Sequence, residues 1–338
     1  MPADPDDFFR MPLGVRAIQA ELAAHQWPSL KEANAFLARR TAEYNAAPQA
    51  ELGGLSPEEM FELLGGDWES TGPLRLNPDL TLADLVGSTF LRNGRHVLSA
   101  AAERKGIRAT AAGNLNRRFV ATLLDPAAWP GRVVEETLEY NKVVNEADLW
   151  PLHILRVVLE VAGLLTRRAD AFRATRRARE LLDDARAGAL QTRLFRAFFR
   201  EFNLAYLTRF GPDEMDPNQR LVPFSLLRLT AVADGWHPGH ELAPALLPAD
   251  ALADDQRPVD PERQPRDQHE RDIVAACSFP TVRYHFLRPL EWFGLLEGRD
   301  RPGPLPAFPF RDVRRTPLFD RFIHFPEPFR QAARRRLG

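Results

Sequence analysis

The stretch that decides the fold is residues 149–184, which read LWPLHILRVVLEVAGLLTRRADAFRATRRARELLDD. Apolar residues recur at spacings of three and four across 151–162, which predicts a largely buried helix. Gly163 follows this helix, and glycine commonly ends a helix because it tolerates the left-handed backbone that the turn requires. Residues 164–168 and 171–175 then have the composition of two short strands around a tight turn. We therefore predict a helix, a two-stranded hairpin and a second helix.

This order resembles the wing and closing helix of winged-helix regulators. The resemblance rests on the Gly-Leu-Leu at 163–165, on FRAT at 172–175 and on RELL at 179–182. The chain departs from that pattern where Arg-Arg-Ala replaces the glycine usual after the threonine, and the turn Ala169-Asp170 also lacks glycine. The resemblance implies that arginines of the hairpin contact DNA phosphates while the helix before it enters the major groove.

Two further stretches look like weaker copies of the same pattern. Residues 90–124 predict a helix, a Gly-aliphatic strand at 106–110 and another helix. Residues 282–323 predict a helix, a second Gly-Leu-Leu, a Pro/Gly-rich loop at 301–309 and a strand at 310–314. Three copies at irregular spacing suggest duplication of one small unit. We therefore predict a mainly α protein with small β-hairpins, built from tandem winged-helix-like units plus helical segments.

Composition shifts divide the chain into five predicted parts. One of them, residues 248–272, has no aromatic residue and carries eight acidic and four basic residues with several prolines, so it is interpreted as a mobile linker. The predicted parts are an N-terminal helical segment (1–80), two winged-helix-like units (81–190), a helical segment (191–247), the linker (248–272) and a C-terminal winged-helix-like unit (273–338). Within the helical segment, aromatic residues at helical spacing over 194–207 form a core face or a groove for a partner.

Composition narrows the function classes. The chain of 338 residues has a formal net charge of −1, so the whole molecule does not attract polyanions strongly. A single cysteine, Cys277, excludes an internal disulfide, and its apolar surroundings favour a place in the core. The start MPADPDDFF lacks the pattern of a signal peptide, and no apolar run is long enough to span a bilayer, so we expect a cytoplasmic protein without membrane contact. Only three of 45 basic residues are lysines, which we attribute to the codon usage of a GC-rich bacterial genome.

The strongest candidate for a site is the basic tract 164–200, which has ten arginines and four acidic residues. The candidate phosphate-binding residues in and near it are Arg167, Arg168, Arg173, Arg176, Arg177, Arg117 and Arg118. The alternative is a solvated face whose arginines pair with nearby acidic side chains. A second objection is that the 151–162 helix is almost wholly apolar, with only His153 and Arg156 to contact bases.

Other chemistry-bearing residues give weaker signals. His237, His240 and Glu241 are possible metal ligands, but they lie in a Pro/Gly turn, so we interpret them as ordinary loop residues and expect no metal. Phosphate-loop, dinucleotide-fingerprint, nucleophile-elbow and HExxH motifs are absent from the sequence. We therefore predict no catalytic residue and no cofactor, while an enzyme whose residues converge from far apart stays a weaker alternative.

The chain also resembles a group of uncharacterised bacterial proteins, and in part the plasmid-encoded pRiA4b ORF-3-like proteins. The pieces that carry this resemblance are ELGGLSPEEM (51–60), ATAAGNLNRRFV (109–120), LHILRVVLEVAGLL (152–165), FREFNLAYL (199–207), FLRPLEWFGLL (286–296) and RRTPLFDRF (314–322). This group implies no established activity and no catalytic residues. Our preferred interpretation is a non-catalytic interaction protein with an unknown protein partner. The alternative is a DNA-binding regulator or a plasmid or mobile-element accessory protein.

Overall fold

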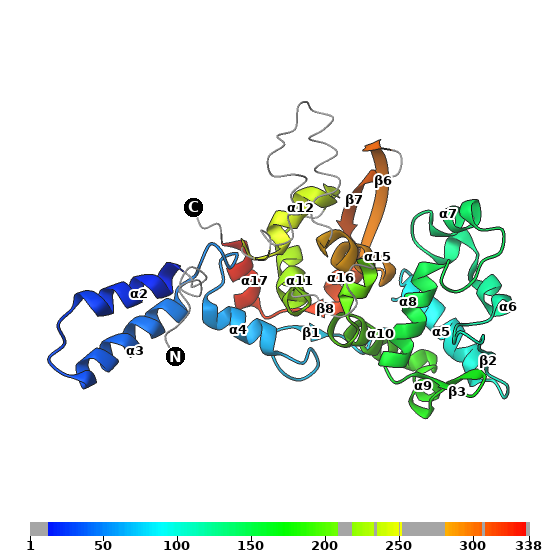
Figure 1. The fold of residues 1–338 in the computed structure, drawn as a ribbon, viewed down its shortest axis with the longest axis horizontal. Coiled ribbons are helices and arrows are strands. Elements are labelled where there is room, and N and C mark those ends of the chain that lie inside the picture. The colour runs from blue at the N-terminus through cyan, green and yellow to red at the C-terminus, as the bar shows by residue number, and fades with distance from the viewer. Residues whose placement is uncertain are drawn as a thin grey trace.

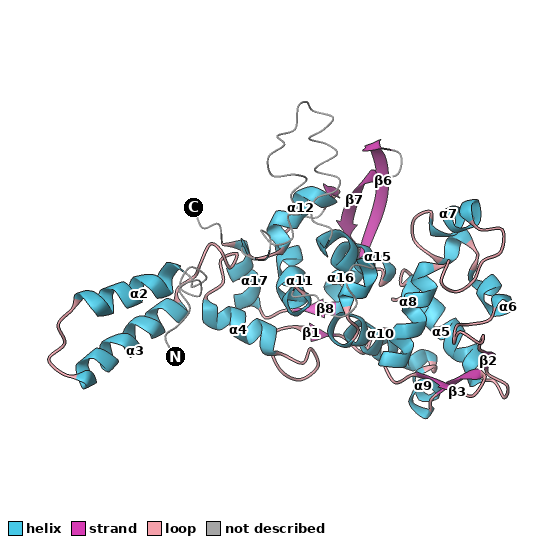
Figure 2. Ribbon diagram, viewed as in Figure 1, coloured by secondary structure: helices cyan, strands magenta, loops and turns pink. Residues whose placement is uncertain are grey.

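The structure, a computed structural model, describes residues 13–208, 218–232, 235–249, 251, 281–305 and 308–335 (Figure 1). Over these residues the protein is mainly helical, with small antiparallel sheets of two or three strands (Figure 2). The predicted fold class, mainly α with small β-hairpins, is confirmed. No helix in the described part of the chain is long and apolar enough to cross a bilayer.

The predicted helix, hairpin and helix form part of a larger arrangement, which we call the first unit. Its elements are α5 (Thr89–Ala102), β2 (Ile107–Arg108), α6 (Arg117–Val120), α8 (Trp150–Val161), β3 (Leu165–Arg168), β4 (Ala171–Ala174) and α9 (Arg176–Leu181). The strands form one antiparallel sheet in the order β2-β4-β3. A long connection between α6 and α8, residues 124–149, contains α7 (Val133–Tyr140).

Local hydrogen bonds explain why this sequence makes the hairpin. Gly163 has φ of +68°, and the Leu164 N–H bonds the carbonyl of Leu159 at 2.9 Å, which closes the end of α8. Ala169, in the turn, has φ of +51°, so this turn does without the glycine expected there. Thr175 caps α9 by accepting from the Ala178 N–H, and its hydroxyl donates to the Gly163 carbonyl at 3.0 Å.

The same order of elements occurs again in the C-terminal half, which we call the second unit. Its elements are α11 (Val222–Ala231), β5 (His237–Pro238), α12 (Gly239–Leu246), a π-helical turn (Thr281–Leu287) that continues into α15 (Arg288–Trp292), β6 (Leu296–Leu305), β7 (Phe308–Arg315) and α16 (Pro317–Phe322). Its sheet order, β5-β7-β6, corresponds to β2-β4-β3. Gly294 takes the place of Gly163 with φ of +73°, and the Thr316 hydroxyl donates to the Gly294 carbonyl at 2.7 Å.

The described residues therefore contain two copies of the unit, and the prediction of three is wrong. The strand predicted at 106–110 does not belong to a separate copy, because Ile107 pairs with Phe172 of β4. The two units predicted within residues 81–190 are therefore one unit with a single three-stranded sheet. The predicted loop at 301–309 is also wrong: β6 and β7 extend into it from both sides. Because β6 is an edge strand, its outer side needs no hydrogen-bond partner and prolines are tolerated there.

The N-terminal segment is tied to the second unit. α2 (Leu13–Ala24) and α3 (Leu30–Ala46) form a helical hairpin that projects from the body (Figure 1). α4 (Pro57–Gly65) begins with a capping box of Ser56 and Glu59. β1 (Arg75–Leu76), within the segment predicted to be helical, pairs with β8 (Ile323–His324), which precedes α17 (Glu327–Arg334). Residues far apart in the chain are therefore joined.

The core between the two units is aromatic. α10 (Ala187–Arg196) and the π-helical turn that follows it (Ala197–Glu201) lie between the units and contribute the fully buried Phe195, Phe198 and Phe199. The Phe293 ring centroid lies 5.1 Å from that of Phe195 and 4.9 Å from that of Phe90. The aromatic residues at 194–207 are therefore core rather than a partner groove.

Two predictions fall outside the described residues. Most of the proposed linker, 252–272, is not described, and Cys277 lies in the undescribed stretch 252–280. The linker and the core position of this cysteine stay predictions.

Candidate binding groove

The predicted arginines differ in their exposure and in their contacts. Arg167 and Arg168 are exposed at the end of β3, and the Arg167 guanidinium lies against Gly113 in the loop after β2. Arg173 is half-buried and donates to the Arg104 carbonyl, so it holds the hairpin to the end of α5. Arg117 donates to the side chain of Asn145 at 2.7 Å.

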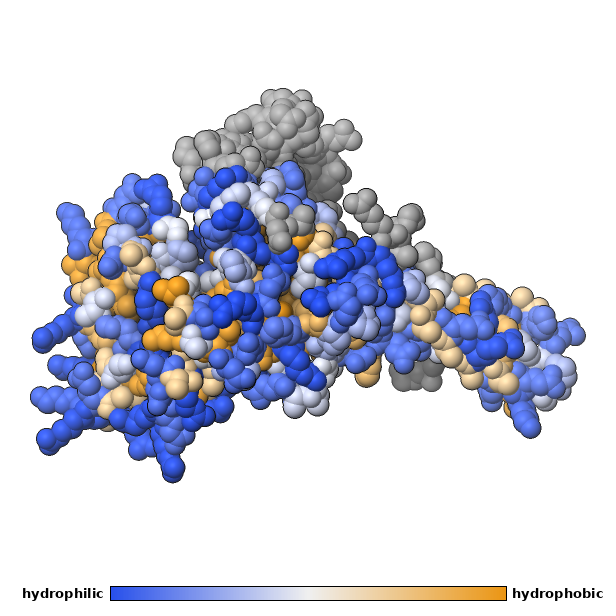
Figure 3. Space-filling view, turned by 180° about the vertical axis from the view of Figure 1, so that it is seen from behind, coloured by the Kyte–Doolittle hydropathy of each residue, from blue (hydrophilic) through white to orange (hydrophobic). Residues whose placement is uncertain are grey.

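The remaining predicted arginines are Arg118, exposed on α6, and Arg176 and Arg177, exposed at the start of α9. Hydrophilic side chains project from the end of the first unit that carries the hairpin and α9 (lower left in Figure 3).

The winged-helix resemblance predicts that α8 reads bases, but the polar side chains of α8 are already bound. His153 and Arg156 both donate to Glu146, at 2.7 and 2.8 Å, and Arg156 also pairs with Glu160. Within α8 only Val161 is exposed, and the other side chains are buried or half-buried. A helix that reads bases needs polar side chains free to reach them. The α6–α8 connection, which supplies Glu146, therefore closes this face of α8.

Glu146 is the centre of that closure because both His153 and Arg156 contact it, and its side chain is fully buried. Burial raises the pKa of the Glu146 carboxyl, but the hydrogen bond from His153, the charge of Arg156 and the Leu115 N–H lower it more, so the pKa lies below its ordinary value. Because a carboxylate can only accept, the His153 Nδ1 carries the proton in this contact, and its Nε2 lies 3.1 Å from the Tyr206 hydroxyl.

A groove opens beside the first unit, between α9, the start of α10 and the segment around 69–78. We call it the basic groove, and its volume is about 920 Å³. Its lining has four arginines and two glutamates, a net charge of +2, alongside apolar side chains and one threonine. The lining residues are Glu69, Leu76, Pro78, Arg176, Arg177, Glu180, Leu181, Arg186, Ala189, Thr192 and Arg193.

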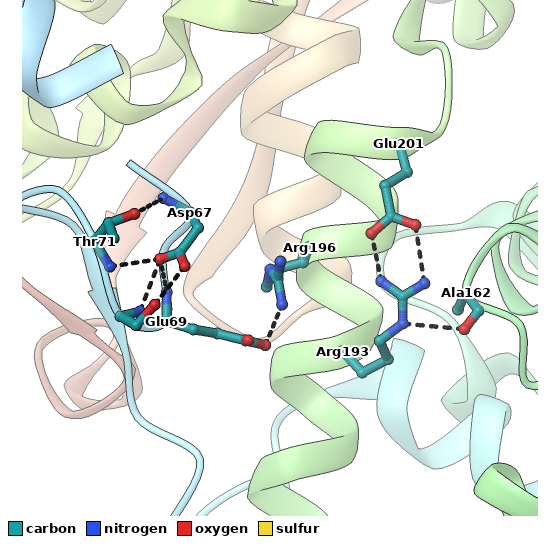
Figure 4. Close-up of polar contacts among 8 residues, drawn as sticks. Asp67, Glu69, Thr71, Ala162, Arg193, Arg196 and Glu201 are labelled. Carbon is teal, nitrogen blue, oxygen red and sulfur yellow. Dashed lines mark hydrogen bonds and ion pairs between the residues drawn. The ribbon is translucent and has the colours of Figure 1, made fainter. Parts of the chain in front are cut away.

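A close backbone contact fixes one wall of the groove. A Cβ on Gly188 would lie 2.3 Å from the Pro78 carbonyl oxygen and 2.6 Å from the Leu80 nitrogen. Glycine at this position therefore lets the 76–80 segment cross α10 at its first turn. Arg196 of α10 pairs with Glu69, which ties the loop before this segment to the same helix (Figure 4).

Asp67 shapes that loop. Its carboxylate accepts from the backbone N–H groups of Glu69, Ser70 and Thr71 at 2.7–2.9 Å and from the Ser70 hydroxyl at 2.6 Å (Figure 4). These hydrogen bonds, led by that of the Ser70 hydroxyl, hold the pKa of Asp67 well below its usual range. The loop also carries the buried Trp68, whose ring centroid lies 5.1 Å from the guanidinium carbon of Arg200.

Comparison with known proteins bears on the first unit. Residues 86–187 match the Y4jL N-terminal domain. The uncharacterised protein y4jL of Sinorhizobium fredii (strain NBRC 101917 / NGR234) is 36% identical over 118 residues, which are 35% of this chain and 53% of that protein. The chain thus spans about half the length of this relative. No solved structure matches.

The match supports an uncharacterised bacterial family and assigns no activity. It covers the whole of the first unit, including the α6–α8 connection. The Y4jL-like segment contributes Arg176, Arg177, Glu180, Leu181 and Arg186 to the basic groove, and the rest of the lining lies outside it. The resemblance to pRiA4b ORF-3-like proteins gains no support from this match and stays a prediction.

The histidines weighed as metal ligands, His237 in β5 and His240 in α12, lie outside the Y4jL-like segment. His240 is 4.0 Å from Glu241, a long contact between neighbours in α12. Within the described ranges, no group of three or more His, Cys, Asp or Glu side chains could hold a metal ion.

The sequence did not point to Arg186, Thr192 or Glu69 as parts of a site. Arg186 and Thr192 both lie within the basic tract 164–200, so a count of charged residues could have included Arg186. Glu69 precedes the Y4jL-like segment by 17 positions, and only the strand pairing and the Gly188 contact bring its loop to the groove.

Replacing Asp67 with alanine should destabilise the protein by about 1–2 kcal/mol, because three backbone N–H groups lose their acceptor. Urea-induced unfolding followed by circular dichroism would measure this loss. Asp67→Asn is the matched control: it keeps one acceptor oxygen, so a loss of half or less is expected. Equal losses in both variants would show that the charge, not the hydrogen-bond geometry, holds the loop.

Proposed function

We propose that this chain is a non-catalytic interaction protein that binds a partner protein through the basic groove beside a winged-helix-like first unit. The winged-helix-like interpretation is supported by the order helix, strand, helix, helix, hairpin and by the β2-β4-β3 sheet. The observation that carries the proposal is the closure of α8 by Glu146. With that helix unavailable for bases, the basic groove is the better surface for a partner.

Crosslinking of the tagged full-length chain in the cells that make it tests this proposal. We expect adducts with a discrete protein that survive nuclease treatment. We also expect the purified chain to bind a random 30-base-pair duplex weakly at about 50 mM salt, with a shallow salt dependence. Adducts that disappear with nuclease, together with tight duplex binding and a steep salt dependence, would overturn it.

The second candidate is a DNA-binding protein that uses the hairpin rather than α8. It is favoured by one observation: Arg167 and Arg168 are both exposed at the hairpin tip. If each contacts a phosphate, the double variant R167A/R168A should lower the slope of log K against log salt by about 2. The control is Arg39→Ala on α3, an exposed arginine far from the hairpin, which should leave the slope unchanged.

A third candidate, an enzyme with an unrecognised site, has one set of side chains to consider. Glu146, His153 and Tyr206 form a hydrogen-bonded chain, as acid–base residues do. Their carboxylate is fully buried, and none of the three lines the basic groove. We therefore assign these three hydrogen-bonded side chains a structural role in closing α8.

A further inference from the structure

The basic groove has two arginines available for a ligand. Arg176 is paired with Glu180 at 2.9 Å, and Arg193 is held by both oxygens of Glu201 and by the Ala162 carbonyl (Figure 4). Arg177 and Arg186 are exposed, and among the described residues neither makes an ion pair or a side-chain hydrogen bond. The net charge of the groove therefore resides on these two side chains.

A buried polar group gives a second, independent sign of a ligand. The Thr192 hydroxyl, in the groove lining, is buried and has no hydrogen-bond partner among the described residues. Buried hydroxyls are nearly always hydrogen-bonded, to protein, water or ligand. Thr192 is only 5% exposed, so the surrounding protein fixes the position of its hydroxyl.

The rest of the lining limits the chemistry of the ligand. Arginine forks match carboxylate and phosphate groups equally well. However, Leu76, Pro78, Leu181 and Ala189 supply apolar surface that a phosphate backbone cannot use. A volume of about 920 Å³ is at the upper end of the range for small-ligand sites, which suits a short peptide segment.

We infer that the basic groove binds an acidic segment of a partner protein, with carboxylates on Arg177 and Arg186 and apolar side chains between them. This inference rests on the proposed function, because it names the part of the partner that the interaction module recognises.

Selection of peptides from a random 12-residue library, displayed on phage and panned against the immobilised full chain, tests the inference. We expect enriched peptides to contain two or more Asp or Glu residues next to leucine or aromatic residues. The double variant R177E/R186E should weaken binding of the best peptide about tenfold or more in fluorescence polarisation, since two charge-assisted contacts become repulsive.

The matched control is K31E/R39E on α3, which changes the net charge equally on exposed residues far from the groove. It should leave the peptide affinity within about twofold. Acid-poor peptides that bind both double variants like the original chain would overturn the inference while leaving the proposed function in place. No peptide enrichment, together with duplex DNA binding lost in R177E/R186E, would overturn both.

Discussion

The substitution Gly294→Ala is expected to destabilise the folded protein by roughly 3 kcal/mol or more. Gly294 has φ of +73°, a conformation that costs a residue with a Cβ about 1–2 kcal/mol. A Cβ there would also lie 2.7 Å from the Gly87 carbonyl carbon and oxygen and 2.8 Å from the Ser88 nitrogen. These atoms are backbone, so relief requires the start of the first unit to move.

Gly163 supplies the control for this prediction. It occupies the same place in the first unit, with φ of +68°, but nothing lies within 4 Å of its Cβ position. Gly163→Ala should therefore cost only the conformational strain, about 1–2 kcal/mol. Thermal and urea unfolding of both variants would measure the difference. Equal losses would show that the contact between Gly294 and residues 87–88 is not held in solution.

The expected difference depends on how the two units are joined. Ser88, which caps α5, donates its hydroxyl to Gln191 at 3.0 Å, and Gln191 donates to the Phe293 carbonyl at 3.1 Å. Ser88 and Gln191 are fully buried, and the chain of hydrogen bonds crosses from the first unit through α10 to the second. Because buried polar groups that lose a partner are costly, we expect the units to unfold together.

The hairpin in residues 149–184 could be predicted because its determinants are local. Helical periodicity, the left-handed Gly163 and the Thr175 cap each act over a few residues. The same holds for the Ser56 capping box. Such short-range signals survive in the sequence whatever the rest of the chain does.

The pairing of distant strands could not be predicted from the sequence. β1, β2 and β5 are each two residues long, too short to show the alternation that marks a strand. Ile107 pairs with Phe172 in a fold where α5 packs against both α8 and β4, and these contacts join residues far apart in the chain. For that reason the sequence suggested three copies of the unit where the described chain has two.

The candidate site was partly predictable for the same reason. Arg176 and Arg177 were identified from the local density of arginine, and they do line the basic groove. Their opposite wall comes from residues 69–78, which reach the groove through tertiary contacts alone. The sequence also raised the objection that the helix before the hairpin is too apolar to read DNA. The closure of α8 by Glu146 gives that objection a structural basis.

Removing the Glu146 carboxylate is expected to cost about 3–5 kcal/mol of folding free energy, the usual penalty for leaving a buried charge without its partner. In Glu146→Ala, the Arg156 Nε, the His153 Nδ1 and the Leu115 N–H lose their acceptor, and Arg156 keeps only its pair with Glu160. Glu160→Ala is the matched control. Glu160 also pairs with Arg156, but its side chain is 32% exposed, so we expect a loss below about 1 kcal/mol.

The pH dependence provides a second check on Glu146. Its pKa in the folded protein lies below the ordinary value, so its contribution to stability is present above the ordinary value and is lost as the pH falls through the folded value. The difference in unfolding free energy between the original chain and Glu146→Gln should therefore be constant near neutral pH and shrink in acid. A difference that grows in acid would mean that the carboxyl is protonated in the folded state. In that case His153 and Arg156 would not be held by a charge, and α8 would be less firmly closed than the hydrogen bonds around Glu146 imply.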